Sequence, residues 1–228
     1  MNEPQQLLMS LGPVEVVLTT VLPVEQAAAA MRSRGEPPMF GLARVPDRVP
    51  GAAQVVHLVT TPGQASAAWD GSTLTVRAAA GELPAEGLLH LAYLVVEAGL
   101  HRRGYLTLHA AAACRDGSAV VLLGSAGAGK TTSLLRLCLD HGAALAGNDL
   151  VVVGGTAAVP EVLAGSCHLR LRHASVAQVM PGLLGLFPDE VSDSWRAKRD
   201  TDPAWLGIKV ATGPVPVAAV VFVHVDMS

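Results

Sequence analysis

The residues best suited to chemistry lie in the stretch GSAGAGKTT, residues 124–132 of this 228-residue chain. Gly124, Gly129, Lys130 and Thr131 match the pattern G-x-x-x-x-G-K-[ST]. Glycines let the backbone curl until successive N–H groups point at phosphate oxygens. The lysine adds a positive charge for the outer phosphates, and the threonine hydroxyl can ligate Mg²⁺. The pattern therefore predicts that this loop holds the phosphates of ATP or GTP together with Mg²⁺.

The whole loop is expected to contact the nucleotide. Its residues are Gly124, Ser125, Ala126, Gly127, Ala128, Gly129, Lys130, Thr131 and Thr132. An apolar run predicts a strand over residues 119–123, and helical spacing predicts a helix over residues 130–141 that Gly142 ends. This order brings the positive end of the helix to the phosphates. A glycine turn that binds no ligand would explain this order of strand, loop and helix less well.

Two residues outside the loop could act on a phosphate. Transfer of a phosphoryl group needs a residue that accepts the proton of the attacking hydroxyl. Asp149 stands at the mouth of a strand expected within residues 143–153 and could accept it. His109, on a strand expected over residues 105–113, could orient that carboxylate. On the residues alone, a core histidine and an Asn-Asp turn remain open as alternatives.

Residues 104–153 resemble the HPr kinase family and its shorter relatives from peptide-modification clusters. The resemblance lies in LHAAAA, RDGSAVVLL, GSAGAGKTT, SLLRLCLDHG and AGNDLVVV, in that order along the chain. It implies an α/β P-loop kinase fold like the HPr kinase C-terminal domain, preceded by a small β-rich module. The activity it implies is transfer of the γ-phosphate of ATP to a serine hydroxyl. The acceptor would be a small protein or a ribosomally made precursor peptide.

The resemblance also assigns roles to individual residues. It makes Asp149, His109 and Lys130 catalytic, with Asp149 as the base and His109 beside the reaction centre. Its metal ligands would be Thr131, Asp149 and Asn148. The family carries an acid where this chain has Asn148, and an amide can offer an oxygen but cannot take a proton. Either Asp149 alone serves as base, or the chemistry of the site is weakened.

A rival interpretation rests on the end of the chain. VAAVVFVHVD is an apolar strand that ends in Asp226, as a Walker B strand does in ordinary P-loop ATPases. It would move the magnesium-associated acid from Asp149 to Asp226. A regulatory ATPase, or a non-catalytic nucleotide-binding protein that recruits a partner, is therefore the alternative function. The kinase is favoured because no further strand or sensor element follows Asp226.

A row of basic residues lies in the stretch CHLRLRH. His168, Arg170 and Arg172 fall on one side of an expected strand, with Leu169 and Leu171 on the other. Such a row could bind an acidic peptide or a phosphate. A solvated face explains it equally well.

Four other residues, later in the chain, are interpreted as structural. Lys198 and Arg199 are expected on an exposed charged helix near residues 189–199. Trp195 and Trp205 are expected in the core.

Two domains must position these residues. Residues 1–84 are expected to form the β-rich module, with strands at 14–21 and 55–61 and a hairpin about Asp70-Gly71. Residues 85–228 are expected to form the P-loop domain. Its first helix should bury the apolar positions Leu88, Leu89, Ala92, Val95, Val96 and Leu100 and end at Gly104.

Composition narrows the function further. Half of the residues are hydrophobic and 15% are charged, so the chain should bury a large core. A net charge of −3 gives no electrostatic reason to expect nucleic acid or an anionic membrane as a partner. The N-terminus has no cationic segment before an apolar run, so no signal peptide is expected. The late apolar stretch at residues 215–225 is too short to span a bilayer and is expected as a buried strand.

Cysteine usage favours the cytoplasm. Cys114, Cys138 and Cys167 form no CxxC pair and have no metal-ligand spacing. An odd, sparse set suits a reducing compartment, with all three as small core residues. A homo-oligomer remains open.

Overall fold

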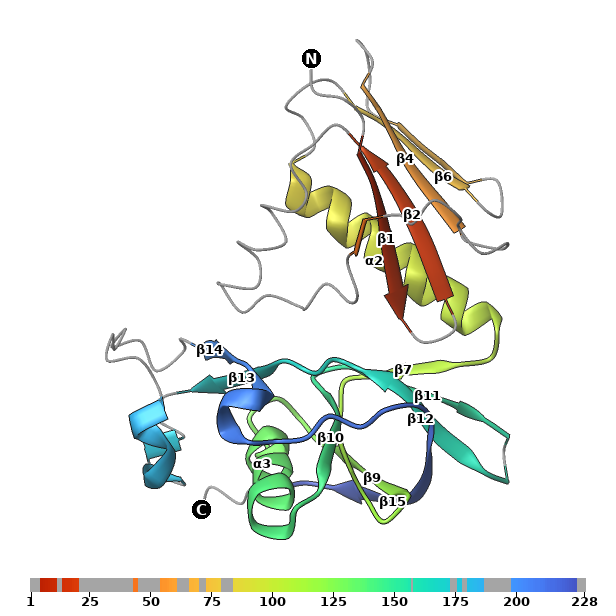
Figure 1. Ribbon diagram of the computed structural model, residues 1–228. Helices are drawn as coiled ribbons and strands as arrows, with labels where there is room; N and C mark the ends of the chain where they lie inside the picture. The colour runs from red at the N-terminus through yellow and green to blue at the C-terminus, as the bar shows by residue number, and fades with distance from the viewer. Residues whose placement is uncertain are drawn as a thin grey trace. The chain divides into compact units, whose positions relative to one another are not determined.

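The computed structural model describes residues 5–11, 14–20, 43–44, 54–60, 66–69, 73–78, 84–156, 158–172, 176–177, 180–186 and 198–224. Contacts divide the chain into two compact units. The first holds Met1–Arg32 with Met39–Gly104, and the second holds Ser33–Pro38 with Tyr105–Ser228. Each unit combines a β-sheet with a helix, so the expectation of a mixed α/β protein is confirmed (Figure 1).

The first unit contains a six-stranded sheet in the order β3-β1-β2-β4-β6-β5. Its strands are β1 (Gln5–Leu11), β2 (Val14–Thr20), β3 (Ala43–Arg44), β4 (Gln54–Thr60), β5 (Ser66–Trp69) and β6 (Thr73–Ala78). The three central strands β2, β4 and β6 are parallel, and the outer pairs are antiparallel. The expected strands at 14–21 and 55–61 are therefore present, and β5 pairs with β6 as the expected hairpin. Asp70 and Gly71 lie outside the described residues.

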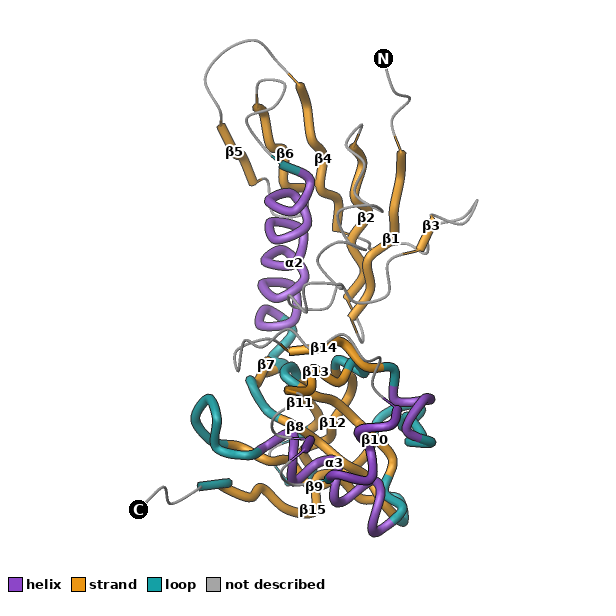
Figure 2. The backbone as a smooth tube through the Cα atoms, turned by 90° about the vertical axis from the view of Figure 1, so that its left-hand side faces the viewer, coloured by secondary structure: helices purple, strands orange, loops and turns teal. Residues whose placement is uncertain are grey.

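Helix α2 (Ala85–Arg102) packs on β1, β2 and β4 (Figure 2). Its apolar positions are buried as expected, with Leu88, Leu89, Ala92, Val95, Val96 and Leu100 between 0% and 6% exposed. Gly104 follows with φ +78°, a conformation that suits glycine. Because α2 packs on the first sheet, the two units divide after Gly104. The expected division after residue 84 lies one helix earlier.

The second unit contains a seven-stranded sheet in the order β10-β8-β9-β15-β12-β11-β7. Its strands are β7 (Leu106–Leu108), β8 (Ala111–Arg115), β9 (Ser118–Leu123), β10 (Ala144–Asn148), β11 (Val151–Gly155), β12 (Pro160–Gly165) and β15 (Val215–Phe222). Strands β9 and β15 are parallel, and the other pairs are antiparallel. Helix α3 (Lys130–His141) packs on β8, β9 and β10.

A separate two-stranded sheet accompanies the seven-stranded one. Strand β13 (Leu169–Arg172) pairs antiparallel with β14 (Lys198–Thr201), and two 3₁₀ turns lie at Pro181–Leu186 and Pro203–Leu206. Lys198 and Arg199 belong to β14, so the expectation of a helix there is wrong. Their cross-strand pairing with β13 outweighs the local helical preference.

Two expected strands are each broken in the middle. Residues 105–113 form β7, which pairs with β11, and then β8, which pairs with β9 and β10. Residues 143–153 form β10 and then β11, which pair with β8 and β7 respectively. Both breaks occur where the chain changes partners, at His109-Ala110 and Asp149-Leu150. The register places them opposite one another.

The last described strand is less buried than expected. Val220, Val221 and Phe222 are 52%, 43% and 78% exposed. Strand β15 pairs with β9 from Val217 to Phe222 but with β12 only through Val215 and Pro216, so its far end has no neighbouring strand on the β12 side. Trp205 is 62% exposed, and the expectation of a core residue is wrong there. Trp195 and Asp226 lie outside the described residues.

Among the helices that the structure describes, none has the length and apolar character needed to cross a membrane.

Candidate functional site

The glycine loop joins the end of β9 to the first turn of α3. Gly127 and Gly129 have φ of +83° and +89°, which an L side chain rarely adopts. Gly129 is the N-cap of α3 and contributes no side-chain hydrogen bond. The Ala128 N–H donates to the Ser125 carbonyl at 3.2 Å, which closes the loop on itself. The first N–H groups of α3 therefore face the space inside the loop without a capping side chain.

Gly124 anchors the loop to the end of β15. A Cβ at this position would lie 2.5 Å from the carbonyl oxygen of Val223, closer than real atoms approach. The Val223 N–H in turn donates to the Leu123 carbonyl at 2.7 Å. Glycine is needed at 124 because two backbones meet there.

Lys130 is buried, with 7% of its surface exposed. Its Nζ donates to the carbonyl oxygens of Gly124 at 2.8 Å and Ser125 at 3.1 Å. An ammonium group is costly to bury without hydrogen bonds, and these two carbonyls provide them. Since both partners are neutral, a phosphate oxygen would be a stronger acceptor for the same group.

Asn148 positions the hydroxyl of Thr131 from behind the pocket. Its Oδ1 accepts the Thr131 hydroxyl at 3.1 Å, and its Nδ2 donates to the His168 carbonyl at 3.1 Å. The carbonyl can only accept, and that fixes which end of the amide faces Thr131. Asn148 is 0% exposed and does not line the pocket. Thr131 gives its proton to Asn148, so its lone pairs are free for another partner.

Asp149 adopts a left-handed backbone conformation with φ +63°. Aspartate tolerates it better than most residues. The Asp149 carbonyl oxygen lies 3.0 Å from Nδ1 of His109. A carbonyl only accepts, so Nδ1 carries the proton in this contact. His109 thus holds the backbone of Asp149, while the Asp149 carboxylate remains free to face the pocket.

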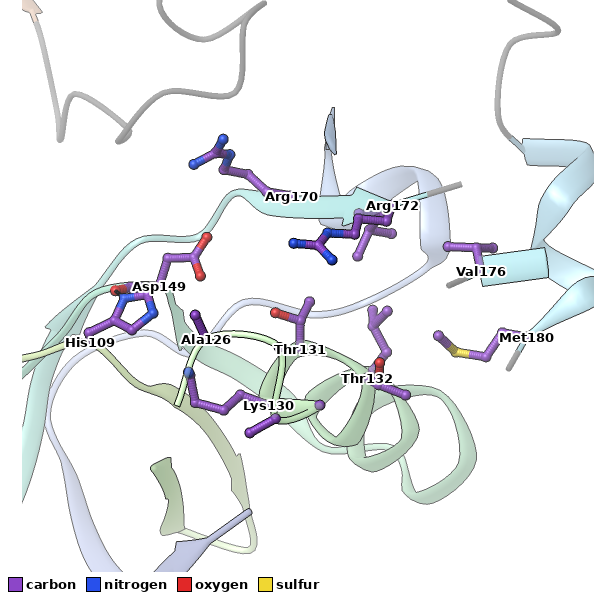
Figure 3. A pocket seen from close by; sticks show the side chains of 15 residues that line it. His109, Ala126, Lys130, Thr131, Thr132, Asp149, Arg170, Arg172, Val176 and Met180 are labelled. Atoms are coloured by element: carbon purple, nitrogen blue, oxygen red, sulfur yellow. Dashed lines mark hydrogen bonds between the residues drawn. The ribbon is translucent and has the colours of Figure 1, made fainter. Parts of the chain in front are cut away.

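Lys130, Thr131, His109 and Asp149 line one pocket of about 160 Å³ (Figure 3). Its walls are formed by His109, Ala126, Gly127, Ala128, Gly129, Lys130, Thr131, Thr132, Leu135, Asp149, Arg170, Leu171, Arg172, Val176 and Met180. Three side chains are cationic, and one, Asp149, is a carboxylate. The pocket therefore favours an anionic ligand.

The structure brings together most of the residues expected at the site. His109, Lys130, Thr131 and Asp149 share the pocket with the rest of the loop from Ala126 onward. Gly124, Ser125 and Asn148 are not among the residues that line it. Arg170 and Arg172, for which two interpretations were open, line the pocket as well.

Sequence reasoning missed the apolar wall made by Val176 and Met180. Both are buried, at 1% and 8% exposure. Their spacing of four residues was the available signal, since it places two side chains on one face of a helical turn. The Met180 N–H donates to the Val176 carbonyl at 2.8 Å, as in such a turn.

The three cysteines are free and lie outside the pocket. Cys138 lies on the buried face of α3, and burial, reinforced by the charge of the nearby Cys114, raises its pKa to about 11. Burial also raises the pKa of the Cys114 and Cys167 thiols, which are partly exposed. All three thiols are therefore protonated and weakly nucleophilic near neutral pH.

No family model matches this chain, and no curated protein is similar to it in sequence. Among solved structures, the HPr(Ser) kinase/phosphatase from Coxiella burnetii is similar over 51% of this chain, with 16% identity and a TM-score of 0.35. The match covers 58% of that structure's chain, so this chain spans a little over half of its length.

Proposed function

We propose that this chain is a P-loop kinase that transfers the γ-phosphate of ATP or GTP to a serine hydroxyl. The acceptor would be a small protein or a ribosomally made precursor peptide. The observation that carries the proposal is the shared pocket of Lys130, Thr131 and Asp149 at the N-terminus of α3. These three groups supply a cation, a metal-binding hydroxyl and a base, which phosphoryl transfer requires.

Nucleotide binding would use the loop. Its backbone N–H groups and the N-terminus of α3 would bind the phosphates. The ammonium of Lys130 would exchange the carbonyls of Gly124 and Ser125 for phosphate oxygens, which form shorter and stronger hydrogen bonds with a cation.

The donor set fits Mg²⁺. Thr131 offers a hydroxyl oxygen whose proton is directed to Asn148, and Asp149 offers a carboxylate. Both are hard oxygen ligands, which Mg²⁺ prefers. Among the described residues, no three or more His, Cys, Asp or Glu side chains lie close enough together to hold a metal ion. Phosphate oxygens and water would therefore complete the coordination shell of Mg²⁺. When bound, the ion would neutralise charge on the phosphates.

Asp149 would act as the base. It is the single carboxylate among the residues that line the pocket. It would take the serine proton as the serine oxygen bonds to the γ-phosphorus. The bond from that phosphorus to the bridging oxygen would break, releasing the nucleoside diphosphate. His109 would keep the Asp149 backbone in place through the contact at 3.0 Å.

The test measures single-turnover transfer from γ-labelled ATP to serine peptides, including peptides encoded by neighbouring genes. Asp149→Asn is expected to slow transfer by ~10²–10⁴, the usual effect of losing a proton acceptor. Asparagine also tolerates the left-handed conformation at 149, so the backbone is preserved. His109→Ala should give a smaller loss, and Asp226→Asn should match the parent chain.

Three outcomes would contradict the proposal. An active Asp149→Asn chain with an inactive Asp226→Asn chain supports the ATPase that uses Asp226. Tight Mg·ATP binding without transfer to any peptide supports a non-catalytic protein, which the neutral Asn148 side chain favours. Failure to bind nucleotide rejects both kinase and ATPase.

A further inference from the structure

Strand β13 carries two arginines that line the pocket. Leu169 and Leu171 are buried at 0% and 3% exposure, in the same core cluster as Leu134 of α3. Because side chains alternate along a strand, Arg170 and Arg172 project from the other face. Both are among the residues that line the pocket, and in Figure 3 the Arg172 guanidinium is turned toward the glycine loop whereas the Arg170 guanidinium is turned away from it.

Arg170 carries a buried donor with no acceptor. Its Nε is inaccessible to solvent and has no hydrogen-bond partner. A buried donor without a partner is costly, and a charged one more so. Such an atom in a pocket wall needs an explanation, and a ligand that supplies an acceptor is one. Arg170 as a whole is partly exposed, so a ligand can reach its guanidinium.

The two arginines occupy different parts of the pocket. Figure 3 shows the guanidinium of Arg172 turned toward the space above Thr131, on the side of the loop. The guanidinium of Arg170 is drawn on the side of Asp149. An acceptor hydroxyl must come within hydrogen-bond reach of Asp149 to give up its proton. Arg170 is therefore the cation suited to a group carried by the acceptor.

We propose that Arg170 binds a carboxylate of the acceptor peptide next to the accepting serine. The proposal rests on the function proposed above and names its substrate class, an acidic peptide. A guanidinium presents parallel N–H donors that match the two oxygens of a carboxylate. Lys130 and Arg172 supply two cations on the phosphate side, which leaves Arg170 for the acceptor. The carboxylate comes from a neighbouring Asp or Glu side chain or from the end of the peptide.

The test follows the arginine Nε–Hε signals of the chain labelled with ¹⁵N-arginine. Arg170→Gln identifies the Arg170 signal by its disappearance. The probes are N-acetylseryl-glutamate amide, with a side-chain carboxylate, and N-acetylglycyl-serine, with a terminal one. N-acetylseryl-glutaminamide is the matched probe without a carboxylate. Each probe is titrated with and without Mg²⁺ and a non-hydrolysable ATP analogue.

At least one carboxylate probe is expected to shift the Arg170 signal, while the glutaminamide probe leaves it in place. The carboxylate probe that shifts the Arg170 signal shows whether the bound carboxylate comes from a side chain or from the end of the peptide. Arg170→Gln should weaken that probe by about tenfold or more, because a charge-assisted bidentate contact is lost. Arg136→Gln is the control, since Arg136 is exposed on α3 and pairs with Asp140 at 3.0 Å away from the pocket.

Three results would overturn the proposal. In the first, the Arg170 signal moves with Mg²⁺ and the ATP analogue but with neither carboxylate probe. In the second, all three peptide probes have the same effect on the Arg170 signal. In the third, Arg170→Gln binds the carboxylate probes as well as the parent chain. Failure of the ATP analogue to bind rejects the proposed kinase separately, because the titrations without nucleotide still decide the role of Arg170.

Discussion

Helices α2 and α3 each lie on a sheet, but their sequences are used differently. Helix α2 has 18 residues and buries a stripe of apolar side chains from Leu88 to Leu100. Helix α3 has 12 residues, and its apolar contacts begin only at Leu134. Its first residues are Lys130 and Thr131, and both line the pocket. One helix is used along its length for packing, whereas the other leaves its first turn to the site.

The N-terminus of α3 shows how leaving the first turn to the site affects the stability of that helix. Neither helix has a side-chain cap at its start, and α3 begins from Gly129 in a left-handed conformation. Glycine loses more backbone entropy on folding than other residues, and a capping side chain stabilises a helix by roughly a few tenths of a kcal/mol relative to glycine. A serine or aspartate at this position would also occupy the N–H groups that face the pocket. The sequence gives up local stability there and keeps those donors available.

The largest expected effect separates binding from folding in α3. Lys130→Ala should weaken Mg·ATP binding by ~10²-fold or more, since losing a hydrogen-bonded charge partner costs ~2–5 kcal/mol. The thermal midpoint should change little, because the lysine contacts only loop carbonyls. Calorimetric titration and thermal unfolding measure the two. Arg136→Ala, on the exposed face of the same helix, is the matched control, and undiminished ATP binding by Lys130→Ala would reject the nucleotide site.

The reverse pattern is expected in α2. Leu89 is fully buried, so Leu89→Ala should destabilise the first unit by ~2–5 kcal/mol. Leu94→Ala, on the same helix but 54% exposed, should cost under ~0.5 kcal/mol. Urea denaturation followed by circular dichroism measures both. Equal losses at the two positions would show that the stripe does not carry the stability of α2.

A smaller effect tests how Thr131 is held. Asn148→Asp replaces the Nδ2 donor with an oxygen that faces the His168 carbonyl, so the fold should lose ~1–3 kcal/mol. A protonated carboxyl can donate to that carbonyl, whereas an ionised one cannot. The pKa of the new carboxyl should be raised, and the loss should be greatest above that pKa and ease as pH falls. Denaturation between pH 5 and 8 measures it. Unchanged stability with tighter Mg²⁺ binding would instead make position 148 a metal ligand.

The smallest effect concerns the packed end of α3. The folded chain holds the Cys138 proton up to a pKa of about 11, while an unfolded cysteine releases it near ~8.5. The unfolded state therefore binds fewer protons in this window. Stability should fall as pH rises through it, by at most ~1.4 kcal/mol per pH unit. Cys138→Ala should remove this part of the slope in urea denaturation at pH 8, 9 and 10, and an unchanged slope would contradict the assignment.

Local signals in the sequence predicted the elements beside the loop. Helix 130–141 and its end at Gly142 are confirmed, because both are determined by residues within a few positions. The break at His109 was not predicted, and a turn at Asn148-Asp149 was only left open as an alternative. Both breaks occur where the chain changes its partner strand, which involves residues far away in the sequence.

The residues of the candidate site also fall into two groups, those that a local motif identifies and those whose position depends on tertiary contacts. Lys130 and Thr131 were identified by a short motif, whose spacing is sufficient evidence. The alternation around Arg170 showed that two faces exist but not which one meets the pocket. That choice depends on Leu169 and Leu171 joining the core under α3, a tertiary contact that no local pattern contains.

The contact between Gly124 and Val223 has a consequence for how sequences of this kind can vary. Val223 meets the loop through backbone atoms, a donor to Leu123 and a carbonyl against Gly124. Side-chain substitutions at 223 leave both contacts in place, except proline, which lacks the N–H. An insertion or deletion of one residue within β15 would reverse which face each later side chain occupies and move the carbonyl away from the loop. Across related chains, the length of this strand should therefore vary less than its composition.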